Sequence, residues 1–278
     1  YKRQGDELTI WWNDNQSSLY KRSGSENSMD LFLKKQDIKV ELPYISQFRL
    51  MDNPNLVFKI CLGYSKDGEA VLTFNGKRVA VSDLEALIEK ERSKHSKMEV
   101  NKLTAMFFFD REISMEEVIE VKGALREIGS LKVAYAGYPE GPLSVSKLAY
   151  HTVALPMVLP PMEAKILDKD KIEQSGTKIF VIDLSARNTS PRAIDQNLER
   201  FIRENDKGKY VFSLEYDKKI PYDQYITSVD IVFQVVYRFR NEMAISRFQV
   251  PYAQLGADLQ KERRKAYPLV LSEAGADE

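Results

Sequence analysis

The sequence has a single cysteine, Cys61, and only two histidines, His95 and His151. One thiol cannot form an internal disulfide, and a zinc site needs three or four ligands that these residues do not supply. Cys61 stands between Ile60 and Leu62, which indicates a buried apolar side chain rather than a nucleophile. These scarcities argue against a zinc centre and against a hydrolase that depends on histidine.

The sequence also lacks an excess of either charge and a long apolar run. Its 278 residues carry 41 basic and 41 acidic side chains, so the formal net charge at pH 7 is zero. A surface that binds nucleic-acid phosphates would leave a clear basic excess, so nucleic acid is not expected as a partner. The apolar run Val153–Pro161 contains three prolines and is shorter than the ~20 residues that span a bilayer.

Motifs for phosphate binding and for a serine nucleophile are absent as well. Gly137, Gly141 and the Asn75-Gly76 dipeptide do not have the spacing of dinucleotide-binding or P-loop sequences. No serine stands in a Gly-x-Ser-x-Gly sequence. We therefore expect a protein that is not an enzyme and that uses no cofactor or metal.

The first half of the chain carries signals for two strands, a tight turn and a helix. Leu56–Leu62 and Glu69–Phe74 are short apolar runs separated by the turn residues Lys66-Asp67-Gly68. The Asn75-Gly76 dipeptide then predicts a tight turn before a helix. Apolar side chains at helical spacing follow at Leu84, Leu87 and Ile88.

A strand, a second helix and a last strand complete this half. Leu103–Phe109 is an apolar run closed by Asp110, which predicts a buried strand. Ser114 and Glu117 have the spacing of a capping box, so a helix is expected to begin there. Leu131–Ala136 is the last predicted strand before a stretch rich in glycine and proline.

The second half repeats this order. The apolar run Lys178–Leu184 takes the place of Glu69–Phe74, and Ser190-Pro191 opens a helix. Tyr210–Tyr216 is the following strand, and a longer helix with a broad apolar stripe comes after it.

The segment between the strand and the second helix is the most similar part of the two halves. Asp217-Lys218-Lys219-Ile220-Pro221 aligns with Asp110-Arg111-Glu112-Ile113-Ser114. We call residues 110–114 the first join and residues 217–221 the second join. Their similarity predicts that one arrangement of strands and helices occurs twice.

The repeat predicts an α+β protein of two tandem small two-layer domains, each a short mixed sheet covered by two helices. Residues 1–37 are expected to be a polar lead-in after a membrane anchor, since the chain starts with Tyr1 and basic residues. Residues 38–137 form the first predicted domain, 138–174 a linker, and 175–278 the second domain with a helical tail.

Asp110, Asp217 and Pro221 are candidate site residues within the joins. Each aspartate ends an apolar strand beside a cation, which invites a catalytic interpretation. However, no histidine or serine motif recurs with them, and an acidic residue before a helix is stabilised by backbone N–H groups and the helix dipole. We expect partner-binding or structural roles for these three residues.

Arg238 and Arg240 are candidates in a basic stretch, Arg238–Lys265, whose charges add to a net +4. Such a stretch can contact anionic lipid or a cell-wall polymer. The alternative is a solvated helical face whose basic side chains cover apolar surface with their stems. Exposed strand edges offer a further route to function, because an edge can accept an extended partner segment by strand addition.

The order of strand, Asn-Gly turn, helix, strand, join, helix and strand resembles the periplasmic domain of the ExbD/TolR family, in two tandem copies. Val79–Ala136 matches the general plan of that family. Tyr210–Glu273, which includes Tyr237-Arg238-Phe239-Arg240-Asn241-Glu242-Met243-Ala244, is similar to the extended C-terminal tail of ExbD-like proteins from the Bacteroidetes. The two matches cover somewhat over half of the chain.

The resemblance implies a role in energy coupling across the inner membrane. In that family a membrane helix with an acidic residue takes part in proton flow, and the periplasmic domain engages an energy transducer or the cell wall. Because this sequence shows no such helix, the resemblance implies binding and force transmission. The implied partners are an ExbB-like multi-span membrane protein, a TonB-like transducer and peptidoglycan, with a homo-oligomer as a further option.

Two other classes of function stay open. The chain could be a periplasmic sensor that binds peptidoglycan or a peptide without a transport partner. A hydrolase would require a pocket in which Asp217, His151 and a serine converge.

Overall fold

The chain divides into two compact units in a computed structural model. The first unit consists of Ser23–Ala164 and Lys218–Thr227, and the second consists of Tyr1–Arg22, Lys165–Asp217 and Ser228–Glu278. The structure describes residues 2–4, 7–11, 17–21, 32–47, 49–50, 54–139, 153–158, 172, 174–185, 190–205 and 208–274.

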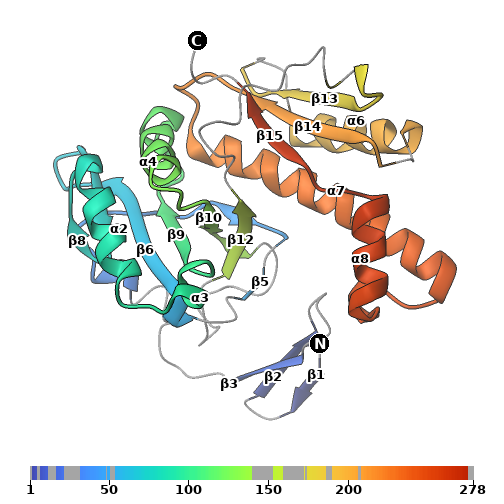
Figure 1. The fold of residues 1–278 in the computed structure, drawn as a ribbon, viewed down its shortest axis with the longest axis horizontal. Helices are drawn as coiled ribbons and strands as arrows, with labels where there is room; N and C mark the ends of the chain where they lie inside the picture. The colour runs from blue at the N-terminus through green and yellow to red at the C-terminus, as the bar shows by residue number, and fades with distance from the viewer. Residues whose placement is uncertain are drawn as a thin grey trace. The chain divides into compact units, whose positions relative to one another are not determined.

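The first unit contains a seven-stranded sheet with the order β5-β12-β10-β9-β6-β7-β8 (Figure 1). The central strands β10, β9 and β6 are parallel, whereas β7, β8, β12 and β5 pair antiparallel to their neighbours. These strands are β5 (Arg49–Leu50), β6 (Val57–Tyr64), β7 (Ala70–Phe74), β8 (Lys77–Arg78), β9 (Thr104–Phe109), β10 (Lys132–Ala136) and β12 (Val153–Val158).

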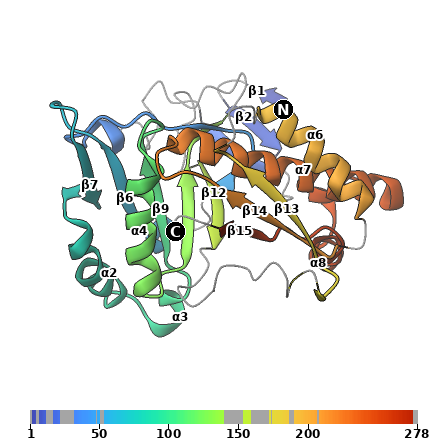
Figure 2. The ribbon, with the colours of Figure 1, turned by 90° about the horizontal axis from the view of Figure 1, so that it is seen from above.

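Short elements and helices complete the first unit. A separate parallel pair joins β4 and β11, and Figure 2 shows α2 and α4 on the same face of the large sheet. These elements are β4 (Tyr44–Ile45), η1 (Pro54–Leu56), η2 (Val81–Asp83), α2 (Leu84–Arg92), α3 (Lys97–Val100), α4 (Met115–Glu127) and β11 (Tyr138–Pro139).

The core of the first unit lies along the parallel strands. Ile60, Phe107 and Tyr135 occupy one row across β6, β9 and β10, and all three are fully buried. Strands that are buried on both faces read as continuous apolar runs, which explains why Leu103–Phe109 lacks alternation. Burial raises the pKa of Cys61 to about 12, in line with the interpretation of this thiol as a buried apolar side chain.

Local signals account for the turn and helix starts of this unit. Asn75 and Gly76 both have positive φ, as a tight hairpin turn requires. Glu117 N–H donates to Ser114 Oγ at 3.5 Å and Ser114 N–H donates to Glu117 Oε2 at 3.0 Å, so the predicted capping box at the start of α4 is confirmed.

The second unit contains a three-stranded parallel sheet with the order β13-β14-β15. Figure 2 shows α6 and α7 on one side of it, and a separate antiparallel sheet is formed by β1, β2 and β3. The elements are β1 (Lys2–Gln4), β2 (Glu7–Trp11), β3 (Ser17–Lys21), β13 (Lys178–Asp183), α6 (Pro191–Glu204), β14 (Tyr210–Glu215), α7 (Tyr222–Phe248), η4 (Tyr252–Gln254), α8 (Ala257–Ala266) and β15 (Leu271–Ala274). The start of α7, as far as Thr227, belongs to the first unit.

The predicted α+β class is confirmed, with two differences in detail. The sheet of the second unit is parallel rather than mixed over its described strands. In addition, the sequence predicts that Lys178–Leu184 is the counterpart of Glu69–Phe74, which contains β7. The parallel pairing of β13 with β14 instead matches that of β6 with β9. β7 follows β6 through a tight turn and must pair antiparallel, whereas β13 reaches its neighbour β14 through α6 and can pair parallel.

Apart from β7, β8, η2 and α3 in the first half and η4 and α8 in the second, the two halves of the chain have the same succession of elements from β6 to β10 and from β13 to β15. The first has β6, α2, β9, α4 and β10, and the second has β13, α6, β14, α7 and β15. In each unit the middle strand of this succession lies between the other two. Residues 138–174, expected to be a linker, contribute β11 and β12, and residues 1–37, expected to be a lead-in, contribute β1–β3.

None of the helices among the described residues has the length and hydropathy needed to cross a bilayer.

Two glycines give a matched test of packing in the first unit. A Cβ atom at Gly63 would lie 2.3 Å from the Lys39 carbonyl oxygen, whereas a Cβ atom at Gly123 in α4 has open space around it. We expect Gly63→Ala to lower the free energy of unfolding by about 1–3 kcal/mol. Gly123→Ala should raise it by about 0.5–1 kcal/mol. Urea unfolding measures both, and a shift of the same sign in the two variants would contradict this packing.

Candidate partner-binding site

Asp110 and Asp217 occupy equivalent positions but different surroundings. Asp110 is buried, and its carboxylate accepts backbone N–H groups from Glu41 at 2.6 Å and Glu112 at 2.9 Å. These donors fix the turn after β9 and attach residue 41 to it. Asp217 is exposed. Asp110 is therefore held by backbone donors, but these come from Glu41 and from its own turn instead of from α4.

Lys218–Pro221 of the second join lies in the same unit as the first join, and the carbonyls of each join accept hydrogen bonds from the first turn of the opposite helix. Ser114 and Pro221 form an antiparallel bridge. Met115 N–H donates to the Ile220 carbonyl at 3.0 Å, and Tyr222 N–H donates to the Ile113 carbonyl at 2.7 Å. Pro221 thus belongs to a contact between the starts of α4 and α7.

A second pair of backbone bonds extends this contact. Glu116 N–H donates to the Lys218 carbonyl at 2.8 Å, and Asp223 N–H donates to the Arg111 carbonyl at 2.9 Å. Nη2 of Arg111 also lies 2.8 Å from Oδ2 of Asp223, and both side chains are partly exposed. The first turn of α7 is therefore bound to the first join by main chain and side chain.

A buried polar cluster lies next to the joins. Lys122 is fully buried on α4, and its Nζ lies 3.2 Å from the Tyr225 hydroxyl and 4.7 Å from the centre of that ring. The Tyr225 and Tyr135 hydroxyls are 3.3 Å apart. Burial raises the pKa of Tyr222 well above its usual value. Sequence reasoning missed Lys122, although its spacing from Val118 and Leu125 places it on the buried face of α4.

Arg238 and Arg240 are both engaged within the second unit. Nη2 of Arg238 lies 2.8 Å from Oδ1 of Asp195 on α6. Nε and Nη2 of Arg240 donate to the Tyr267 carbonyl at 2.9 and 2.7 Å, and burial lowers the pKa of Arg240. This geometry connects α7 to α6 and to the segment before β15.

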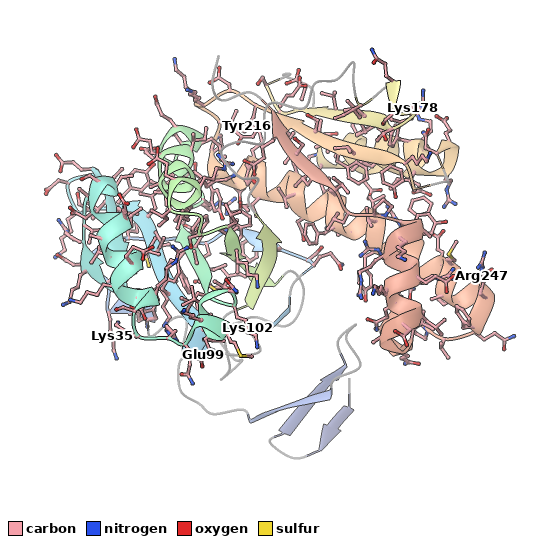
Figure 3. All side chains as sticks on the ribbon, viewed as in Figure 1. Lys35, Glu99, Lys102, Lys178, Tyr216 and Arg247 are labelled. Carbon is pink, nitrogen blue, oxygen red and sulfur yellow. The ribbon has the colours of Figure 1, made fainter. Side chains whose placement is uncertain are left out.

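Other cations of the basic stretch are divided between interior and surface. Arg263 is buried, with its guanidinium over the Phe248 ring. Arg247, which Figure 3 labels near the end of α7, is exposed. Lys261, Arg264 and Lys265 are also exposed. The stretch therefore combines helix-packing cations with a set that faces solvent.

The described sheets differ in their edges. The large sheet ends in β5 and β8, which have two residues each, and β8 consists of the exposed cations Lys77 and Arg78. Short charged edges resist pairing with another chain. In the small parallel sheet β13 is a six-residue edge strand that begins at Lys178, labelled in Figure 3, and pairs with β14 alone among the described strands.

Metal-ligating side chains do not gather in the described part of the chain. No group of three or more His, Cys, Asp or Glu side chains there could hold a metal ion. His151, named for the hydrolase alternative, lies outside the described residues.

The two arginines give a second matched test. Lysine cannot reproduce the two hydrogen bonds that converge from Arg240 on one carbonyl oxygen, so Arg240→Lys should lower the free energy of unfolding by about 1–3 kcal/mol. Arg238→Lys alters a half-exposed ion pair and should cost less than about 1 kcal/mol. Equal losses in urea unfolding would show that Arg240 has no special role in holding the Tyr267 segment.

Comparisons of the chain with models of known protein families, with curated proteins and with solved structures found no match.

Proposed function

We propose that the chain is a non-enzymatic, periplasm-facing component of an ExbD/TolR-type complex that couples the proton-motive force to transport. In this proposal it is anchored at the inner membrane and binds an ExbB-like multi-span protein and a TonB-like transducer. The sequence of the two joins and of Tyr210–Glu273 supports the family. The recurrence of one strand and helix order in both units supports two tandem copies.

The edge of β13 is the observation that supports partner binding best. Lys178 N–H donates to the Lys209 carbonyl at 2.9 Å, and Leu184 N–H donates to the Glu215 carbonyl at 2.8 Å. Backbone groups alternate along a strand, so the amides of even-numbered residues face β14. The N–H groups of Ile179 and Val181 consequently point away from β14.

An extended partner segment could add beside β13 as a further strand. Its main chain would bond to the outward amides and carbonyls, with little demand on its side-chain sequence. Val181 is 41% exposed and would give this segment an apolar contact. Binding of this kind suits a protein that holds a partner under load rather than one that transforms a substrate.

Binding to peptidoglycan is a second candidate, and the exposed cations favour it. Arg247 lies in the last turn of α7, and Lys261, Arg264 and Lys265 lie on α8. Carboxylates and phosphates of wall polymers would be attracted to them. This interaction would weaken as salt is added, whereas strand addition depends on backbone hydrogen bonds and is less sensitive.

A proline at the edge tests strand addition. We expect Val181→Pro to remove one outward N–H while leaving the β13–β14 ladder in place, and to reduce capture of a TonB-like transducer at least about tenfold. Val181→Thr keeps both the amide and the β-branched shape and should bind like the unaltered chain. Pull-down from membrane extract, quantified by mass spectrometry, measures the capture.

The same pull-down separates the two candidate functions. Enrichment of a multi-span ExbB-like protein together with the transducer supports the motor component. Retention on isolated peptidoglycan, without any such membrane partner, supports the wall-binding alternative and ends the first proposal. Capture that is equal for Val181→Pro and Val181→Thr would leave β13 without a role.

A further inference from the structure

The contact between the joins consists of matching backbone hydrogen bonds in both directions. Met115 and Tyr222 are the first residues of α4 and α7, and Glu116 and Asp223 are the second. In each helix both of these N–H groups donate to carbonyls of the opposite join. The acceptors are Ile220 and Lys218 for α4, and Ile113 and Arg111 for α7.

The first N–H groups of a helix have no acceptor within that helix. Side chains or water usually satisfy them, but here each join supplies two carbonyls to the other helix. The charged side chains show the same symmetry. Arg111 of the first join aligns with Lys218 of the second join, and Glu116 of α4 aligns with Asp223 of α7. The surface formed by a join and the following helical turn is thus complementary to another copy of itself.

We propose that the paired joins are a self-complementary interface folded into one chain, and that the first turns of α4 and α7 form and open together. The partner that fits each join is the other join. Loss of order in one join and the helical turn after it removes two carbonyl acceptors and two N–H donors from the opposite join and turn, so a disturbance at one of these helix starts reaches the second directly. This inference does not depend on the identity of any external partner.

Proline at the second position of α4 tests the coupling. Glu116 is exposed, so Glu116→Pro removes the N–H that donates to Lys218 without opening the core. The readout is hydrogen exchange at the Tyr222 and Asp223 amides, on the other side of the contact. We expect their exchange to accelerate about tenfold, because a lost bond of this kind shifts local opening by that order.

Two variants serve as controls for this measurement. Asp258→Pro places proline at the second position of α8, removes an acidic side chain in the same way, and should leave Tyr222 and Asp223 unaffected. Glu116→Gln keeps the N–H and should also leave them unaffected. The reverse variant, Asp223→Pro compared with Asp223→Asn, should accelerate exchange at Met115 and Glu116.

The unaltered protein provides a test that needs no substitution. Amides of residues 115, 116, 222 and 223 should exchange with one common dependence on denaturant, because they open as one unit. The proposal is overturned if the two joins show different denaturant dependence. It is equally overturned if the acceleration in Glu116→Pro stays within α4, or if Asp258→Pro accelerates exchange at Tyr222 and Asp223 as much.

Discussion

Backbone groups at the start of a helix must find partners outside it, and this constraint organises the region around the joins. The first N–H groups of α4 and α7 each donate to carbonyls of the join before the other helix, and the bridge between Ser114 and Pro221 lies at the centre of this contact. The same turn holds Asp110, whose carboxylate attaches residue 41 to the end of β9. Main-chain hydrogen bonds therefore hold the starts of both helices, and the carboxylate of Asp110 fixes the turn beside them.

Much of the fold could be predicted from sequence because its signals are local. The Asn75-Gly76 turn, the capping box at Ser114 and the apolar spacing of α4 each depend on residues within one or two turns of chain. Strand partners are different, because pairing joins distant segments. Periodicity could not show that Lys178–Asp183 pairs parallel to β14, or that Val153–Val158 pairs with β10. The similarity of the joins was visible in the sequence, but their mutual contact was not, since it is made by main-chain atoms.

For the candidate site residues, too, the sequence shows local features but not contacts with distant segments. Arg240 and Arg238 were selected for their charge, and charge alone does not tell whether a guanidinium meets a partner or the protein's own carbonyl and carboxylate groups. The spacing of Lys122 from Val118 and Leu125 could have placed it on the buried stripe of α4. However, lysine is so seldom buried that the residue type argues against a buried position. Among the described residues, the exposed edge of β13 and the exposed cations of α8 are the features to which the proposed function assigns partner binding.

The position of β13 at the edge of the described sheet has a consequence for handling the protein. Among the described strands only β14 pairs with β13, and the outward N–H groups of Ile179 and Val181 do not distinguish a cognate segment from the same strand of a neighbouring molecule. Val181 adds an exposed apolar side chain beside them. The strand carries the exposed Lys178 at one end and the exposed Asp183 at the other, so an antiparallel pair of identical strands would bring opposite charges together. Concentrated stocks are therefore prone to form intermolecular sheets, and a short soluble peptide that occupies this edge would keep the molecules dispersed.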